Sequence, residues 1–330
     1  MMEATLPKNF APDFRPLLRE RHNDYRAGLP IERHDRCFVT HSGIALKRFR
    51  LIRETAYVGN IGPRVVPHFH RYALYKFFTG RRIRSDDPRL LLLHNHWGGG
   101  YYHWLTECLI KVPLVDPSRY VVLLPADFPQ FAAESLALFP FAGTLRLPPG
   151  HGLSAKTVTV VGNPHPGRPN PEQLQQLKQD LLTRCRGTAL GRERVYLTRR
   201  DALWRRVENE AEVVSTLERY GFDVVDPSRL SFCEQVGLFS GCRAMVSVHG
   251  AGLTNMMFMP EGGRVLELLR ELESADAETN PAYWHLSTIG KLDYYYQFCQ
   301  RGQNEGEGVN QVNVIVDIER LEQNIQLMLA

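Results

Sequence analysis

The chain has 330 residues, 43% of them hydrophobic and 23% charged, which is enough apolar material for two ordinary domains or one large one. Its 40 basic and 36 acidic residues leave a formal net charge of +4, so the composition gives little support for nucleic acid as the main partner. The apolar run from Leu90 to Leu93 is far too short for a transmembrane helix, which needs about 20 residues.

The cysteines and the first residues of the chain indicate the kind of cellular compartment in which the protein is expected. No two cysteines have CxxC spacing and no Cys/His zinc pattern is present, so we expect buried free thiols and a reducing compartment. Residues 1–10 are polar and predict no signal peptide. The six cysteines are Cys37, Cys108, Cys185, Cys233, Cys242 and Cys299.

In the first half, apolar runs of strand length alternate with helical patterns, which predicts a mostly parallel α/β sheet. A loop rich in glycine and aromatic residues, 95–104, separates the first of these strands from the first helix. The predicted strands are residues 89–93, 120–125 and 157–161, and the predicted helices are residues 105–112 and 131–139.

A segment dense in proline and glycine, residues 162–171, is the clearest boundary in the chain. Asn170 is predicted to cap a helix that runs to about Cys185. The order beyond it is typical of a doubly wound nucleotide-binding domain, in which ligands bind at the carboxyl ends of the strands. Strands are predicted at 194–198, 222–225, 244–248, 265–268 and 312–316. One helix is predicted at 208–220, a second begins at the capping box of Ser231 and Glu234, and a third spans 318–329 after the cap Asp317.

Four arginines follow the strand at 194–198, namely Arg199, Arg200, Arg205 and Arg206. Guanidinium groups in such a loop can hold a diphosphate through paired hydrogen bonds. The alternative is a solvated loop in which Asp201 and Glu208 are the ion-pair partners.

The strand at 244–248 leads into a turn that contains His249, Gly250, Ala251 and Gly252. Glycines allow a backbone to come close to a ligand, and the N–H groups of such a turn can face an anion. We therefore predict that His249 binds a phosphate or a sugar hydroxyl. Glu267, at the end of the next strand, either accepts hydrogen bonds from sugar hydroxyls or pairs with Arg264 or Arg270.

His103 and Glu107 are four residues apart and share one face of a helix that begins by residue 103. A carboxylate that orients an imidazole makes a general base. Alternatively, His94, His96 and His103 bind a metal, or the aromatic residues around them form core and the histidines only satisfy loop backbone.

Four segments together resemble family 61 of the glycosyltransferases. They are GGGYYHWLTE (98–107), RVYLTRRDALWRRVENEAEV (194–213), LSFCEQVGLF (230–239) and SVHGAGLTNMMFMPEGGRVLEL (247–268). The last three, in this order and spacing, form a specific signature. Gly98 to Gly100 depart from the more usual polar residue before the two tyrosines.

The resemblance implies an α/β protein of GT-B type, in which two Rossmann-like domains face a cleft. It implies an inverting transfer from a nucleotide-diphosphate sugar to a glycan or lipid-linked saccharide, with no metal and no further cofactor. Arg199 and Arg205 then resemble donor-phosphate ligands, and His103 with Glu107 is the candidate catalytic pair on the acceptor side. The expected donor site comprises Arg199, Arg205, His249, Gly250, Ala251, Gly252, Leu253, Asn255 and Glu267.

We expect an acceptor-side domain over residues 1–165 and a donor-binding domain over 166–312. Residues 313–330 are expected to pack back on the first domain. A bacterial cytoplasmic enzyme, peripheral at the inner membrane, fits these features. The alternatives are a sugar-nucleotide epimerase or hydrolase of the same architecture, or a non-catalytic subunit that binds nucleotides or glycans.

Overall fold

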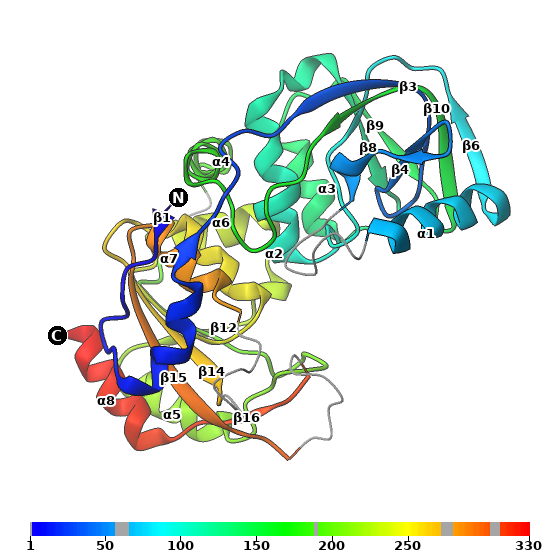
Figure 1. Ribbon diagram of the computed structural model, residues 1–330. Helices are drawn as coiled ribbons and strands as arrows, with labels where there is room; N and C mark the ends of the chain where they lie inside the picture. The colour runs from blue at the N-terminus through cyan, green and yellow to red at the C-terminus, as the bar shows by residue number, and fades with distance from the viewer. Residues whose placement is uncertain (1, 57–65, 188–190, 272–279, 304–310) are drawn as a thin grey trace. The chain divides into compact units, whose positions relative to one another are not determined.

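The computed structural model describes residues 2–56, 66–187, 191–271, 280–303 and 311–330. The chain divides into two compact units (Figure 1). The N-terminal unit is Asp24–Asp180, and the C-terminal unit combines Met1–Asn23 with Leu181–Ala330. Each unit has its own β-sheet and hydrophobic core.

The boundaries of these units differ from the predicted division at residues 165/166, because the N-terminal unit runs from Asp24 to Asp180. The segment rich in proline and glycine stays attached to the N-terminal unit, because Lys111 Nζ donates to Asn163 Oδ1 at 2.7 Å and Asn170 Nδ2 donates to the carbonyl oxygen of Arg26 at 3.0 Å. Asn170 also caps the following helix as expected, since its Oδ1 accepts from the backbone N–H of Gln173.

The C-terminal unit contains a doubly wound sheet in the strand order β12-β11-β13-β14-β15-β16. All neighbouring pairs are parallel except β15 with β16. The chain leaves β11 toward one edge and returns to the other side of β11 as β13, so the topological switch point lies between β11 and β13. The strands are β11 (Arg194–Leu197), β12 (Asp223–Val225), β13 (Ala244–Val248), β14 (Arg264–Arg270), β15 (Asp293–Arg301) and β16 (Val314–Ile315).

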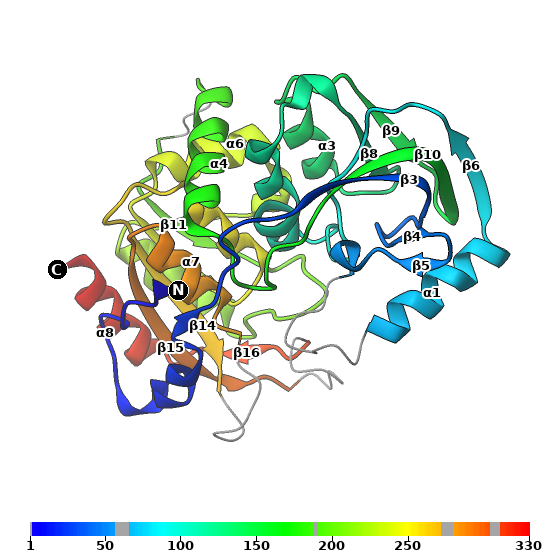
Figure 2. The same cartoon turned by 45° about the horizontal axis from the view of Figure 1, so that its top comes forward.

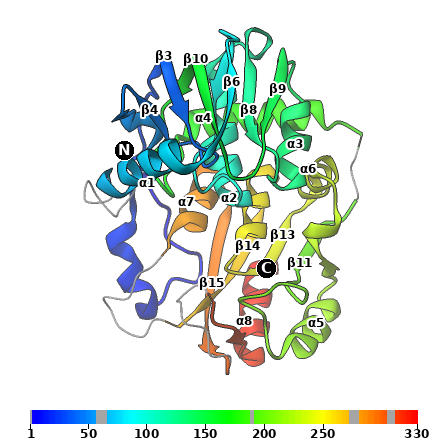
Figure 3. The same ribbon diagram turned by 90° about the vertical axis from the view of Figure 1, so that its right-hand side faces the viewer.

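Helices α5 (Glu210–Arg219) and α8 (Ile318–Leu329) lie side by side against this sheet (Figure 3). Leu321, Ile325 and Met328 of α8 are buried in the core of the C-terminal unit. The terminal segment therefore packs in this unit, although it was expected on the first domain. The expected helix caps are confirmed. Asp317 caps α8, and Ser231 caps α6 (Phe232–Gly241).

The first residues of the chain also belong to the C-terminal unit. Its opening segments are β1 (Met2–Glu3), the 3₁₀ helix η1 (Pro12–Glu20) and β2 (His22–Asn23). Phe14 of η1 packs with Trp284 of α7 (Ala282–Ile289) and with Tyr296 of β15. The sequence patterns did not predict this return of the N-terminus.

The N-terminal unit contains a mixed sheet, and the expectation of a mostly parallel one is only partly right. Strands β10, β7, β8 and β9 are parallel neighbours, but β3 runs antiparallel to β10, and β4 and β5 continue antiparallel beyond it. The strands are β3 (Ile31–Val39), β4 (Ala45–Lys47), β5 (Arg50–Leu51), β6 (Arg81–Ser85), β7 (Leu90–Leu92), β8 (Val121–Pro125), β9 (Gly143–Leu147) and β10 (His151–Val161).

Helices α1 (Val66–Thr79) and α3 (Gln130–Ala137) belong to the N-terminal unit, and α4 (Pro171–Arg184) runs from this unit into the C-terminal one. Helix α1 lies along β4 and β5 (Figure 2). The helix expected at 105–112 is irregular: α2 (Tyr101–His103) is followed by a π-helical turn, Trp104–Cys108, and a 3₁₀ turn, Leu109–Leu114. Isolated π turns are frequent at functional sites.

One expectation about the cysteines is wrong. Cys185 and Cys233 form a disulfide that joins the end of α4 to the start of α6, and their Cα atoms are 5.1 Å apart. The remaining cysteines are free and buried, as expected. A disulfide is typical of an oxidising environment, so it gives no support to a reducing compartment. Among the described residues, no helix is both long and apolar enough to cross a membrane.

Candidate functional site

Two loops of the C-terminal unit meet at the switch point of its sheet, one after β11 and one after β13. A Cβ atom on Gly250 would lie 2.8 Å from Nη1 and 3.2 Å from Cζ of Arg199. The φ of Gly250 is 172°, which any residue adopts, so the effect of a Cβ here would be to push the Arg199 guanidinium aside.

Arg199 and Arg205 are partly buried cations that lack full hydrogen bonding. The Nε atoms of both are buried and have no hydrogen-bond partner among the described residues, while Nη2 of Arg199 donates to the carbonyl oxygen of Trp204 at 3.1 Å. Burial lowers the pKa of both guanidinium groups, and the charge of Arg205 lowers that of Arg199 further. Two such cations side by side favour a bound anion.

The backbone at Arg205 supports a role in binding. Its φ is +58°, in the left-handed region that residues other than glycine rarely adopt. Such strain is common at ligand sites. The solvated-loop alternative does not describe these arginines, because Asp201 pairs with Arg229 and Glu208 accepts from the backbone N–H of Gln303.

His249 is held by a buried carboxylate on the neighbouring strand. Its Nδ1–H donates to Glu267 Oε1 at 2.5 Å, and the other oxygen of Glu267 accepts from the hydroxyl of Tyr294 at 2.6 Å. Glu267 is only 1% exposed, so its carboxylate orients the imidazole of His249 and does not face a ligand. Among the described residues, Glu267 forms an ion pair with His249, whereas Arg264 and Arg270 were the partners considered from the sequence.

The rest of the turn serves the fold more than a ligand. Residues Ala251–Phe258 form a 3₁₀ helix, η8. Leu253 and Asn255 are fully buried, and Nδ2 of Asn255 donates to Oε1 of Gln235 in α6. Gly252 packs closely on the preceding strand, since a Cβ there would lie 3.3 Å from Cδ1 of Leu197. Of the residues predicted for the donor site, the structure thus gathers Arg199, Arg205, His249 and Gly250, with Glu267 behind His249.

The N-terminal unit holds the second candidate site, a dyad of His103 and Glu107. Nδ1 of His103 donates to Glu107 Oε1 at 2.8 Å, as their spacing predicts. The other oxygen of Glu107 accepts from Asn95 Nδ2 at 3.0 Å, and Glu107 is 1% exposed. The indole of Trp97 stacks on the His103 ring, with centroids 5.6 Å apart.

The other two histidines of this loop have different surroundings. His94 is buried, with its ring nitrogens 3.1 and 3.2 Å from the carbonyl oxygens of Leu123 and His41. Burial lowers the pKa of His94 to about 4, and it does the same for His96. No group of three or more His, Cys, Asp or Glu side chains within the described ranges could hold a metal ion.

The two sites offer complementary chemistry. A neutral imidazole whose Nδ1–H is fixed by a carboxylate can accept a proton at Nε2, which is what a general base requires. Two incompletely bonded guanidinium groups beside the turn after β13 can bind and stabilise a phosphate or diphosphate.

Several residues of these sites were not predicted from the sequence. Tyr283 of α7 lies against His249, with ring centroids 5.1 Å apart. Tyr294 and Asn95 hold the two carboxylates. Buried tyrosines are common core residues, so no sequence pattern singles them out. Only the strand order places Tyr294 beside β14.

Comparisons with known proteins agree on one class. The model of the family described as Glycosyltransferase 61 matches residues 101–266, which includes His103, Glu107, Arg199, Arg205 and His249. A segment of 76 residues is 36% identical to the EGF domain-specific O-linked N-acetylglucosamine transferase of Drosophila melanogaster. That similarity covers 22% of this chain and 14% of the fly protein.

Proposed function

Because the chain belongs to glycosyltransferase family 61, and is therefore a glycosyltransferase, we propose that it transfers a sugar from a nucleotide-diphosphate sugar bound in the C-terminal unit. The observation that carries this proposal is the pair Arg199 and Arg205. Both present buried, unsatisfied Nε groups at the switch point of a doubly wound sheet, where such folds bind nucleotides.

In this proposal the arginines stabilise the leaving diphosphate. As the bond between the anomeric carbon and the phosphate oxygen breaks, negative charge grows on that oxygen. Fixed cations at that oxygen lower the barrier to bond cleavage because they need not reorganise. They take the place of a metal ion in stabilising the negative charge. His249, oriented by Glu267, presents Nε2 on the side of its ring away from that carboxylate.

His103 is the proposed base. Its Nε2 accepts the proton of the acceptor hydroxyl while the hydroxyl oxygen attacks the anomeric carbon on the face opposite the leaving diphosphate, which inverts the configuration. Glu107 holds the imidazole in the tautomer this step requires. The acceptor class is a glycan or a lipid-linked saccharide, and a GT-B arrangement is our proposal for how the two substrates meet.

Donor binding tests the arginine assignment. Titration with a panel of nucleoside diphosphates is expected to show binding that Arg199→Gln weakens about 10- to 100-fold, because a hydrogen bond to a charged group contributes about 1.5–3 kcal/mol. Gly250→Ala is expected to weaken binding as well, because its new Cβ displaces the Arg199 guanidinium.

Gly241→Ala is the matched control for the second variant, since a Cβ at Gly241 meets nothing within 4 Å. It should bind like the unmodified protein. Nucleotide binding that is unchanged in Arg199→Gln would rule out the diphosphate assignment. A product assay with and without acceptor separates transfer from epimerisation or hydrolysis, which convert the donor alone.

A further inference from the structure

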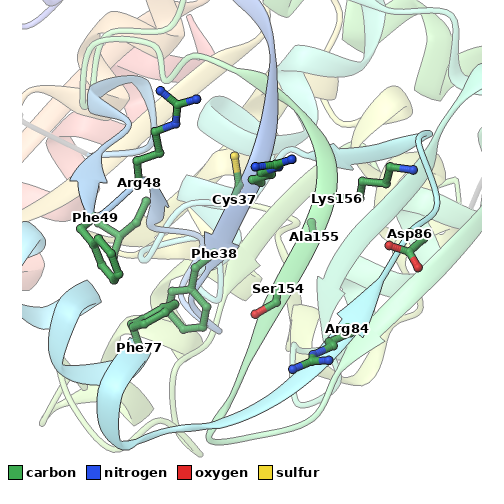
Figure 4. A pocket seen from close by; sticks show the side chains of 12 residues that line it. Cys37, Phe38, Arg48, Phe49, Phe77, Arg84, Asp86, Ser154, Ala155 and Lys156 are labelled. Carbon is green, nitrogen blue, oxygen red and sulfur yellow. The ribbon is translucent and has the colours of Figure 1, made fainter.

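A cavity of about 550 Å³ lies in the N-terminal unit over strands β3, β4, β6 and β10. This volume lies in the range of small-molecule sites. None of the residues that line it belongs to the His103–Glu107 dyad or its immediate contacts. Figure 4 shows aromatic side chains gathered at one end of the cavity and charged side chains of β6 and β10 at the other.

The charged lining is strongly cationic. The cations Arg36, Arg48, Arg84 and Lys156 line the cavity together with a single carboxylate, Asp86. All four cations are exposed, and no ion pair of theirs with an acidic side chain occurs among the described residues. A positive cavity that opens to solvent favours an anionic group.

The apolar part of the lining is aromatic. The Phe77 ring packs edge-on against Phe38 at 5.1 Å and against Phe49 at 5.2 Å. A Cβ on Gly152 would lie 2.3 Å from the Phe38 ring, so the sheet makes room for this ring with a glycine. Phe49 is 54% exposed although it is fully apolar.

The exposed aromatic surface continues along helix α1. Tyr75 and Phe78 are 61% and 70% exposed, and Phe78 stacks on Phe49. Arg71 lies on the same outer face of the helix, four residues before Tyr75 and seven before Phe78. Aromatic and basic side chains on one outer helix face are typical of an interfacial helix on a membrane.

Residues with positive φ occur at the same place. Arg36, Arg48 and Phe49 have φ values of +54°, +48° and +65°, and they are three of the five non-glycine residues with positive φ in the described ranges. Arg48 and Phe49 form the two-residue turn between β4 and β5, a type of turn in which both central residues take positive φ, so the hairpin fixes Phe49 at its exposed position.

We propose that this face binds an anionic phospholipid membrane. The cavity receives the phosphate of a lipid headgroup between Arg36, Arg48, Arg84 and Lys156, while Phe49, Tyr75 and Phe78 enter the interfacial layer. A free phosphate or sugar phosphate would use the cations but would leave the exposed rings without a role, so the surface favours a lipid. The proposal does not depend on which sugar is transferred.

Vesicle sedimentation tests it without an activity assay. The protein should bind vesicles of phosphatidylcholine mixed with phosphatidylglycerol, should bind pure phosphatidylcholine much less, and should lose binding as salt rises. Each cation near an anionic surface contributes about fivefold, so Arg36→Gln with Arg84→Gln should weaken partitioning about thirtyfold. Phe78→Ser should weaken it at every salt concentration.

The controls remove the same number of charges, and one exposed apolar side chain, elsewhere. Arg192→Gln with Arg243→Gln, both exposed in the C-terminal unit, and Leu327→Ser, 50% exposed on α8, should leave partitioning nearly unchanged. Equal loss in the control pair, or equal binding to both kinds of vesicle, would overturn the proposal. Inorganic pyrophosphate that binds at Arg36 and Arg84, with no vesicle binding, would assign the cavity to a soluble anion instead.

Discussion

Glu107 accepts a hydrogen bond at each carboxylate oxygen, one from His103 and one from Asn95. A glutamine in its place has the same shape but only one acceptor oxygen. If that oxygen stays with Asn95, the amide NH₂ faces Nδ1 of His103 and favours the tautomer with the proton on Nε2. Nε2 of the imidazole then has no lone pair to accept the proton of the acceptor hydroxyl.

Glu107→Gln is therefore expected to lower kcat about 10²- to 10⁴-fold, the usual contribution of a general base. Nucleoside diphosphate binding should be unchanged, because the arginines are untouched. The pH profile of kcat distinguishes this role from a structural one, since loss of the base removes its acidic limb. A variant with full activity and an unaltered profile would show that the dyad only stabilises the loop.

Some contacts of the two candidate sites follow from the local sequence, and others do not. The spacing of His103 and Glu107 predicted their contact, because residues four apart share a helix face. The local sequence did not distinguish Arg199 and Arg205 from Arg200, which pairs with Glu210, and only the family resemblance singled the two out. The sequence suggested that Glu267 contacts a ligand, but the side chain is buried and its carboxylate positions His249.

At the scale of elements, the strands and caps of the C-terminal unit were largely predictable. Strand β13 has the predicted bounds, and the capping box at Ser231 is present. The disulfide was not predictable, because Cys185 and Cys233 are 48 residues apart and match no motif. Only the packing of α6 beside the end of α4 brings the two sulfur atoms together.

The disulfide leads to a stability prediction. A crosslink that closes a loop of this length restricts the unfolded chain, and it is expected to contribute about 3–4 kcal/mol to the free energy of unfolding. The double variant Cys185→Ser with Cys233→Ser should lose that amount in denaturant unfolding. A reducing agent should lower the stability of the unmodified protein and leave the double variant unchanged. Equal sensitivity of both proteins would mean that the bond does not form in solution.

At the scale of the molecule, the two ends of the chain meet in the C-terminal unit. Asp13 of η1 pairs with Arg320 of α8 at 2.9 Å, and Asn9 Nδ2 donates to Asn324 Oδ1 at 2.9 Å. The sequence predicts a doubly wound sheet for the second half, but it carries no local signal that residues 1–23 return to cover it. This contact joins residues about 300 positions apart, so periodicity and capping patterns cannot reveal it.

This arrangement predicts that an N-terminal substitution destabilises only the C-terminal unit. Phe14 is fully buried against Trp284 and Tyr296, and removing a buried phenylalanine ring costs about 3–5 kcal/mol. Phe14→Ala should therefore speed amide hydrogen exchange in β15 while β8 keeps its protection. Phe10→Ala removes a ring that is 39% exposed and should have little effect. Faster exchange in both units would instead mean that the chain unfolds as one cooperative body, because damage to one core would then open the other.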